Sequence, residues 1–396
     1  MTVNPRLIPR PRRNNERPIL VRSTLVSVAA VLTIPALLAS CTSKSDNASG
    51  NDIAVTADDS TCAVAKDSAE TGTVTFRITN NGAKVTEFYV YGAGERVIGE
   101  IENIGPGLTR QLIVSVPDPG KYQTACKPGM VGDGIRHDFT VTGQAQQRDD
   151  SGKLAEATEG YRRFLISQVT ALQETTKSFV AAIKAGDIET AKKQYPVTRT
   201  YYERIEPVAE SFPNDLDPRL DLREADVAAG DKWTGFHRLE KDLWAQGRQP
   251  DTDQIADQLL ADVGELVTGI SAADYSVDPV QMAGGAQTLL DEIARTKITG
   301  EEDTFSHTDL WDFQANIDGS QAAIASLRPI IDERNPDLGT QIDRRFAELD
   351  SELAKYRQGD GHVSYDTVNA DGRAALARHI DALSAVVSQV QAVVAR

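Results

Sequence analysis

The spacing of apolar residues changes once along this chain of 396 residues, and this change constrains the fold more than any other feature. Between residues 53 and 143 apolar and polar residues alternate, as in the segment TVTFRITN at 73–80. A period of two is typical of strands with one buried face. From residue 154 onward apolar residues recur every three or four positions, which is typical of amphipathic helices. The chain is therefore predicted to fold as a β domain followed by an all-α domain.

The first region contains short alternating segments that are separated by Gly, Pro and Asn residues. We expect strands at 73–80, 85–91, 97–101, 108–116, 121–125 and 139–141. Together with the alternating residues from Ile53 onward, these six segments make some seven short strands within about ninety residues, which predict an antiparallel β-sandwich over residues 53–143. The polar segment 144–152 is interpreted as the linker to the second domain.

The second region is predicted to be a helical bundle over residues 153–396. Helical periodicity covers 154–185, 187–212, 233–246, 253–268, 280–296, 304–328, 336–358 and 367–395. Pro196 and Pro207 are expected to kink or divide the second helix, because proline lacks a backbone donor and clashes with the preceding turn. Seven or eight helices with short connections predict two four-helix units.

The N-terminal segment has the composition of a secretion signal. Six arginines precede an uncharged, mostly apolar run at 23–39, which is interrupted by Pro35 and is short for a membrane span. The sequence LASC at 38–41 resembles a bacterial lipobox, which predicts a signal peptide at 1–40 and lipidation of Cys41. Residues 41–52 form a polar tether. We expect an extracytoplasmic protein that is periplasmic or lipid-anchored to the outer face of the cell membrane.

Charge and absent motifs exclude several functions. The chain has 42 Lys and Arg against 58 Asp and Glu, a net charge of −16, so nucleic-acid binding is not expected. The zinc-protease motif H-E-x-x-H, the nucleophile elbow G-x-S-x-G, the P-loop and the C-x-x-C redox pair are all missing from the sequence.

Acids and histidines in the helical region suggest a metal site. His237 and Glu240 are separated by three positions, so they share one face of a helix and could bind one ion. Glu203 and Glu206 have the same spacing. Alone, an H-x-x-E pair is weak evidence, because most such pairs lie on the solvated surface.

Two further candidates lie in apolar surroundings or at a helix start. Asp291 sits in the segment LLDEI, and His307 opens another predicted helix. Two carboxylates about 4 Å apart repel by about 4 kcal/mol at an effective dielectric constant of about 20. Several of them inside a bundle are therefore expected to require a bound cation or protonation. Oxygen and imidazole ligands suit iron, zinc, manganese or copper(II).

These residues carry a resemblance to a known family. Gly235, His237 and Glu240 match the G-x-H-x-x-E signature of the imelysin-type bundle, which the region 153–396 resembles. The segment KITGEEDTFSHTDLWDF at 297–313, together with LLDE at 289–292, is similar to the EfeO-type components of bacterial iron uptake. The order of signal, β domain and bundle also agrees with that family.

The resemblance implies a cupredoxin-like β domain and an iron-binding bundle. It further implies two partners, an EfeU-type iron permease and an EfeB-type haem peroxidase. Cupredoxins bind copper through His, Cys, His and Met, but His137 is the only histidine of this β domain, so a blue-copper site is incomplete. The candidate ligands there are Cys62, Glu87, Cys126 and Met130. A Cys62–Cys126 disulfide is an equally weighted alternative, in which case Glu87 and other acids remain to hold a hard ion.

The sequence thus leads to one main hypothesis. The bundle is expected to bind iron(II) or iron(III) with His237 and Glu240, joined by Glu206, Asp291 and His307, with Glu203 as an alternate; the β domain is expected to hold copper or a second iron ion. The protein would capture iron and deliver it to the permease without being an enzyme. The alternatives are a metal-dependent peptidase that uses the H-x-x-E site, and a metal-free interaction protein.

Overall fold

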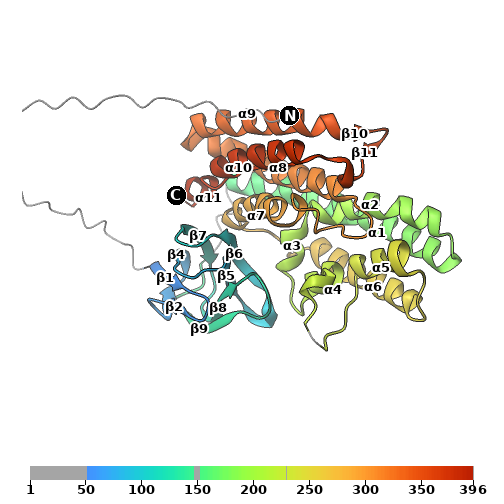
Figure 1. Cartoon of the computed structure of the whole chain (residues 1–396). Coiled ribbons are helices and arrows are strands. Elements are labelled where there is room, and N and C mark those ends of the chain that lie inside the picture. Colours follow the sequence, from blue (N-terminus) through green and yellow to red (C-terminus); the bar gives the residue numbers. More distant parts are fainter. Residues whose placement is uncertain (1–50, 147–151, 229, 396) are drawn as a thin grey trace, which may run out of the picture. The chain divides into compact units, whose positions relative to one another are not determined.

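The computed structural model describes residues 51–146, 152–228 and 230–395 (Figure 1). The predicted signal peptide, the lipidation site Cys41, nearly all of the tether and most of the predicted linker lie outside these residues. Among the helices in the described ranges, none is long and apolar enough to cross a membrane.

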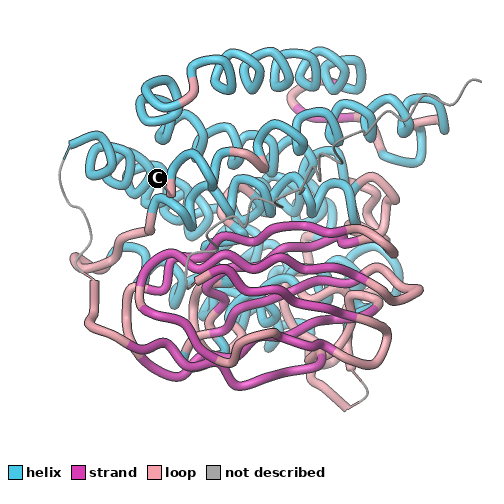
Figure 2. The backbone as a smooth tube through the Cα atoms, turned by 90° about the vertical axis from the view of Figure 1, so that its left-hand side faces the viewer, coloured by secondary structure: helices cyan, strands magenta, loops and turns pink. Residues whose placement is uncertain are grey.

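The β domain is a sandwich of two sheets, drawn in magenta in Figure 2. One sheet has the strand order β2-β1-β4-β7 and the other the order β3-β9-β8-β5-β6. The strand bounds are β1 (Asp52–Ala57), β2 (Cys62–Val64), β3 (Ser68–Glu70), β4 (Gly72–Asn80), β5 (Thr86–Tyr91), β6 (Val97–Ile104), β7 (Thr109–Val116), β8 (Gly120–Pro128) and β9 (Ile135–Thr142).

The predicted antiparallel pairing is wrong for two strand pairs. β1 runs parallel to β4, and β3 runs parallel to β9. The chain leaves the first sheet after β2, adds β3 to the second sheet and returns as β4, so these pairings depend on a crossover that alternation does not reveal. Between the sheets, the rings of Phe76, Phe88 and Phe139 pack together, which explains why every second residue of these strands is apolar.

The helical domain follows from Gly152 onward. Its main helices are α1 (Gly152–Ala185), α2 (Ile188–Glu203), α6 (Thr252–Ser271), α7 (Pro279–Glu292), α8 (Asp309–Arg334), α9 (Pro336–Leu353) and α10 (Ala370–Val387). Shorter elements are α3 (Glu206–Glu210), α4 (Leu216–Asp221), α5 (Phe236–Lys241), α11 (Val390–Val394) and the hairpin β10 (Arg357–Gln358) with β11 (Gly361–His362). Two π-helical turns extend α5 and α7, namely η3 (Asp242–Gln246) and η4 (Ile293–Lys297).

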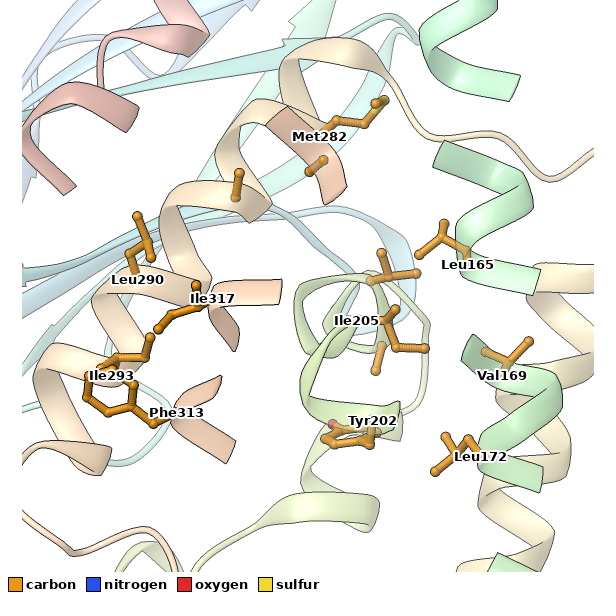
Figure 3. Packing of buried hydrophobic residues seen from close by; sticks show 14 of the residues in the cluster. Leu165, Val169, Leu172, Tyr202, Ile205, Met282, Leu290, Ile293, Phe313 and Ile317 are labelled. Atoms are coloured by element: carbon orange, nitrogen blue, oxygen red, sulfur yellow. The ribbon is translucent and has the colours of Figure 1, made fainter. Parts of the chain in front are cut away.

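Helix α8 packs against α1, α2, α7 and α9, so the helices share one continuous apolar core. Figure 3 shows part of this core, with Leu165 and Val169 of α1 on one side and Phe313 and Ile317 of α8 on the other. The prolines behave differently. Pro196 does not divide the helix, since α2 continues through it, whereas Pro207 lies in the first turn of α3, beyond the end of α2, where its missing N–H costs nothing.

The β domain and the helices pack against each other in one compact unit, residues 48–396. Helix α7 packs along β6 and β7. Arg110 of β7 forms an ion pair of 3.1 Å with Asp291, and the Asn103 side chain donates to the Asp291 carbonyl oxygen at 3.0 Å. These contacts place strands β6 and β7, one from each sheet, against helix α7.

Candidate metal centre

The geometry of the candidate centre depends on Gly235, the residue directly before helix α5. Gly235 has φ 89°, in the left-handed region, and a Cβ atom there would overlap the carbonyl oxygen of Leu220. Only glycine lets α5 start directly against the end of α4. The close approach brings Asp221, the last residue of α4, to His237 in the first turn of α5.

One ring nitrogen of His237 is held by Glu240. Nδ1 lies 3.3 Å from Glu240 Oε2, and the other carboxylate oxygen accepts hydrogen bonds from the backbone N–H groups of Phe305 and Ser306 at 2.9 and 2.7 Å. Glu240 is therefore fixed by the loop before α8 and in turn orients the imidazole. Such an oriented histidine presents its second nitrogen to a ligand.

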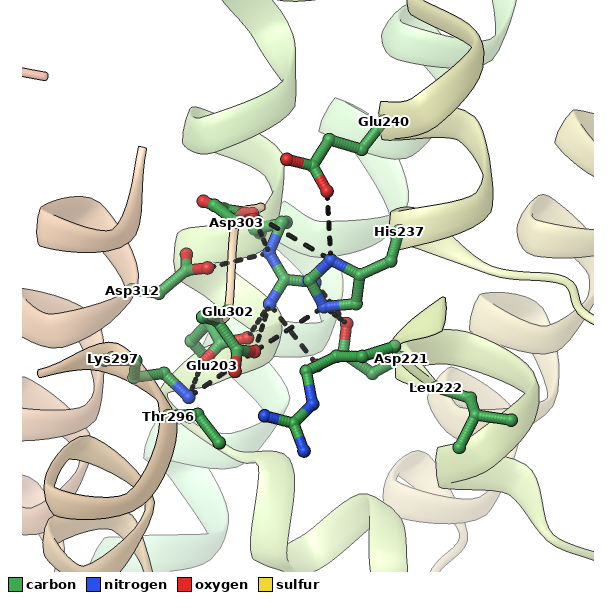
Figure 4. A network of polar contacts seen from close by, with 12 residues as sticks. Glu203, Asp221, Leu222, His237, Glu240, Thr296, Lys297, Glu302, Asp303 and Asp312 are labelled. Carbon is green, nitrogen blue, oxygen red and sulfur yellow. Dashed lines mark hydrogen bonds and ion pairs between the residues drawn. The ribbon is translucent and has the colours of Figure 1, made fainter. Parts of the chain in front are cut away.

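The second ring nitrogen faces two carboxylates (Figure 4). Nε2 of His237 lies 3.5 Å from Asp221 Oδ1 and 3.5 Å from Glu302 Oε1, and it is buried without a hydrogen-bond partner. Ligand atoms of these three side chains all lie within 4.8 Å of one another. An imidazole and two carboxylates at these distances form a three-ligand site of the kind that binds divalent and trivalent cations.

Two buried, positively charged side chains lie among the carboxylates. Arg199 of α2 pairs with five carboxylates of the described chain: Glu203, Asp221, Glu302, Asp303 and Asp312. Lys297 of η4 lies 3.2 Å from Glu203 and 3.6 Å from Glu302. The expectation that a bound ion or protonation relieves the crowding is therefore incomplete, because Arg199 and Lys297 supply part of the positive charge, while burial raises the pKa values of Glu206 and Asp312 toward protonation.

The surroundings shift the pKa values in opposite directions. Burial and the Arg199 charge lower the pKa of His237, but the carboxylates of Asp221, Glu240 and Glu302 outweigh them and raise it to about 10. Burial by itself would raise the pKa of Glu302, yet Lys297 and His237 hold it well below its usual range. Glu302 is therefore an ionised carboxylate at neutral pH, as an oxygen ligand of a metal ion has to be.

The predicted helical residues divide into two groups. His237, Glu240 and Glu203 lie within one ion-pair network, and Glu206 is buried beside it near Lys297. Asp291 lies apart, since its side chain contacts Arg110, Gln287 and Ser384.

His307 is also outside the network. It has a left-handed φ of 56°, its side chain is 40% exposed, and its Nδ1 lies 3.5 Å from Asp366. The structure therefore does not bring Asp291 and His307 to His237, although each is close in sequence to a residue that does approach the centre, namely Glu292 and Asp303.

Sequence reasoning missed four carboxylates and both buried cations. Glu302 and Asp303 lie in the loop before α8, within the segment 297–313 that the resemblance singled out. A run of three acids, Glu301 to Asp303, was the available signal. Asp221, at the end of a short helix that periodicity did not predict, and Asp312 gave no comparable signal.

In the β domain, the two cysteines form a disulfide between β2 and β8. Both sulfur atoms are therefore unavailable as thiolate ligands, and the disulfide alternative is the one the structure contains. Cys126 and the neighbouring Phe88 belong to the sandwich core, whereas Glu87 is on the opposite face of the sheet, where Tyr89 Oη donates to it at 3.2 Å. The proposed set of Cys62, Glu87, Cys126 and Met130 thus cannot converge on one ion.

An acidic cleft leads to the centre. Its volume is about 630 Å³, and it lies between the outer face of the β5-β6-β8 strands and the α3–α4 region. The acids that line it include Glu87, Glu102, Glu206, Asp217, Asp221 and Glu302, and they outnumber the basic residues of the lining, such as Arg223 and Arg295. Two of the three candidate ligands, Asp221 and Glu302, therefore line the cleft. A cation could approach His237 Nε2 along their carboxylates.

The stability of the metal-free protein is expected to fall as pH rises from about 4 to 8. Burial and the Asp221 charge raise the pKa of Asp217 from 3.8 to about 8, and burial raises that of Glu203 from 4.5 to about 7. A carboxyl group whose pKa is raised on folding favours the folded state below its unfolded pKa, and this contribution is lost as pH rises through the folded pKa. Melting temperature between pH 5 and 8.5, with chelator present, measures the effect.

The matched variants for this test are Asp217→Asn and Asp360→Asn, the second at an exposed position. Asp217→Asn should reduce the decline in melting temperature with pH, and Asp360→Asn should leave it unchanged. An unchanged decline in Asp217→Asn would contradict the assignment.

Comparisons with known proteins agree with this architecture. A family model described as Imelysin matches residues 157–390, and one described as Cupredoxin-like domain matches residues 29–141. The "Iron uptake system component EfeO" of Escherichia coli O157:H7 is 40% identical over 350 residues, which are 86% of this chain and 91% of that protein. The same figures hold for the proteins of that name from E. coli K12 and Shigella flexneri.

Solved structures show weaker similarity. A putative iron-regulated protein A precursor from Parabacteroides distasonis is 14% identical with a TM-score of 0.45, and covers 63% of this chain and 96% of its own. Auracyanin from Roseiflexus castenholzii is 20% identical with a TM-score of 0.21, and covers 24% of this chain and 98% of its own.

Proposed function

The chain belongs to the imelysin family and to the EfeO components of bacterial iron uptake systems, and on this premise we propose that its helical domain captures an iron ion outside the cytoplasm and delivers it to a membrane permease. His237, Asp221 and Glu302 are the proposed ligands. Glu240 positions the imidazole, and Glu203 and Glu206 lie along the approach from the acidic cleft.

The main support for the proposal is that His237 Nε2 is buried and has no hydrogen-bond partner. A buried imidazole nitrogen without a hydrogen-bond partner is costly, and here two carboxylate oxygens lie 3.5 Å from it. A cation beside Nε2 would give the nitrogen a partner, and the two carboxylate oxygens, which also pair with Arg199, would complete the ligand set. Imidazole and carboxylate are suitable ligands for iron, and the family membership favours iron over other metals with the same preference.

We propose iron binding rather than peptide hydrolysis because of the role of Glu240. In a metallopeptidase that used this pair, Glu240 would have to activate a water molecule as a general base. Its Oε1 accepts two backbone hydrogen bonds, and its Oε2 faces His237 Nδ1 on the side of the ring away from the proposed ion. These contacts support a positioning role.

We propose an extracytoplasmic location, with Cys41 as the lipid anchor and with an EfeU-type permease and an EfeB-type haem peroxidase as partners. The Cys62–Cys126 disulfide supports this location, because disulfides persist in oxidising compartments and are rare in the cytosol. The relatives are named as components of an iron uptake system, which supports the existence of partners.

For the β domain we propose a second hard cation, iron rather than copper, near Glu87. The disulfide removes the thiolates that a copper site of the cupredoxin type uses. Glu87 is buried, and it lines the acidic cleft together with Glu102 and Met130. The carboxylates suit a hard ion, whereas the Met130 thioether does not.

The test is an iron titration of the mature protein, residues 41–396. Purified protein is titrated anaerobically with iron(II) and separately with a weak iron(III) chelate, and bound iron is counted after desalting. Asp221→Asn and Glu302→Gln should each lose the iron of the helical centre. Asp291→Asn is the matched control, since it alters a buried carboxylate outside the network, and it should keep that iron. Equal iron content in all variants, or peptide cleavage that depends on metal and on His237, would contradict the proposal.

A further inference from the structure

We infer that Arg199 restricts the metal centre to a single ion, because its guanidinium group occupies a second carboxylate site that shares Glu302 with the first. This inference rests on the proposed function, since it concerns how many ions the same centre holds.

Three sets of possible ligand atoms lie close together among the described residues. One of them, His237, Glu240 and Asp303, includes the Glu240 carboxylate that the backbone N–H groups before α8 already hold. The two other sets are the candidate sites for two neighbouring ions. The first set is His237, Asp221 and Glu302, and a second set is Glu203, Glu302 and Asp312, whose oxygen atoms also lie within 4.8 Å of one another. All are buried. In carboxylate-rich helical bundles, two sets of this kind joined by shared glutamates hold a pair of metal ions. From its ligands alone, this centre would therefore be expected to bind two.

The guanidinium group occupies the second set. Arg199 Nε donates to Asp312 Oδ2 at 2.8 Å, Nη2 donates to Glu302 Oε1 at 3.1 Å, and Nη2 also pairs with Glu203. Each member of the second set thus already has a charged donor. Arg199 also pairs with Asp221 and Glu302 of the first set, so His237 Nε2 is the ligand atom of that set left without a hydrogen-bond partner among the described residues. Lys297 Nζ adds a second positive charge, 3.2 Å from Glu203 and 3.6 Å from Glu302.

A metal ion cannot readily displace this arginine. Arg199 is fully buried, and its guanidinium carbon lies 5.8 Å from the ring centre of Tyr195 and 5.6 Å from that of Phe236. Arginine does not lose its proton in proteins, so it cannot become a neutral side chain when a cation approaches. The first set differs, because its His237 Nε2 is buried and has no hydrogen-bond partner among the described residues, cationic side chains included.

The restriction suits a protein that must release its cargo. An ion held by one set of ligands is released when those bonds alone break. A pair of ions that shares Glu302 would require both sets to open.

The experiment counts ions in crystals of the mature protein soaked anaerobically with iron(II), from anomalous difference maps at the iron edge. The wild type should show one peak in this network, beside His237 Nε2. Arg199→Met, which removes the charge and keeps an apolar side chain, should show two peaks about 3.5–4 Å apart. Arg199→Lys should show one. Arg204→Met is the matched control on the neighbouring turn, where the arginine pairs with Asp318 instead, and it should also show one.

The folding of Arg199→Met provides a second measurement. If the variant is unfolded without metal, it is refolded with iron(II), and native mass spectrometry then compares the number of ions bound by Arg199→Met with the number bound by the wild type. One additional ion is expected. Two peaks in the wild-type network, no additional ion in Arg199→Met, or failure of iron to restore folding would each overturn the inference. Absence of any peak in the wild-type network would instead overturn the proposed function, so the two failures are distinguishable.

Discussion

Replacing His237 with alanine is expected to abolish iron binding at the helical centre, with a loss of affinity of at least about 100-fold. Mutation of residues that only orient a metal ligand typically costs about 10–100-fold, and this change removes a ligand itself. It removes the one nitrogen of the proposed set and leaves Asp221 and Glu302 as two like charges. Competition with a chelator of known affinity, using iron(II) under anaerobic conditions, measures the change.

Glu240→Gln serves as the graded control. It keeps the size of the side chain and weakens only the orientation of the ring, so its affinity should lie between those of wild type and His237→Ala. Far-ultraviolet circular dichroism should show unchanged helicity in both variants. Wild-type affinity in folded His237→Ala would disprove the assignment of the centre.

Replacing both Cys62 and Cys126 with alanine is expected to destabilise the β domain by about 2–5 kcal/mol, the usual cost of losing a native disulfide in a small domain. The bridge joins positions 64 residues apart and lies in the sandwich core, so its loss frees a long loop in the unfolded chain. Chemical denaturation followed by circular dichroism measures the change. Alanine keeps the site apolar.

The same variant separates a structural from a metal-binding role of the cysteines. Iron and copper content should match those of the wild type, because both sulfurs are already bonded to each other. A selective loss of a metal ion from the folded double variant would show that the sulfur atoms act as ligands after all.

The fold was largely predictable because hydrophobic periodicity is a local property. Alternation located most of the strands, and the period of 3.6 located the long helices. The parallel pairings of β1 with β4 and of β3 with β9 were not predictable, since they depend on the path of the chain between two sheets. The short helix α4 was missed because six residues are too few to establish a period.

Only the part of the candidate metal centre that comes from residues close together in the sequence was predictable. His237 and Glu240 lie one helical turn apart, and this spacing alone places them together. Asp221 and Glu302 reach the same ring from a short helix and from a loop, and no spacing in the sequence connects them. His307 was a plausible candidate by residue type, but its left-handed backbone places it at a partly exposed position beside Asp366.

The contact between Gly235 and the Leu220 carbonyl shows that the centre depends on a position that contributes no ligand. The methyl group of an alanine at position 235 would push α4 and α5 apart, and it would separate Asp221 from His237 without touching either side chain. The proposed cation site thus requires a position without a Cβ atom. Harmful substitutions should therefore be sought among closely packed backbone positions as well as among the proposed ligands.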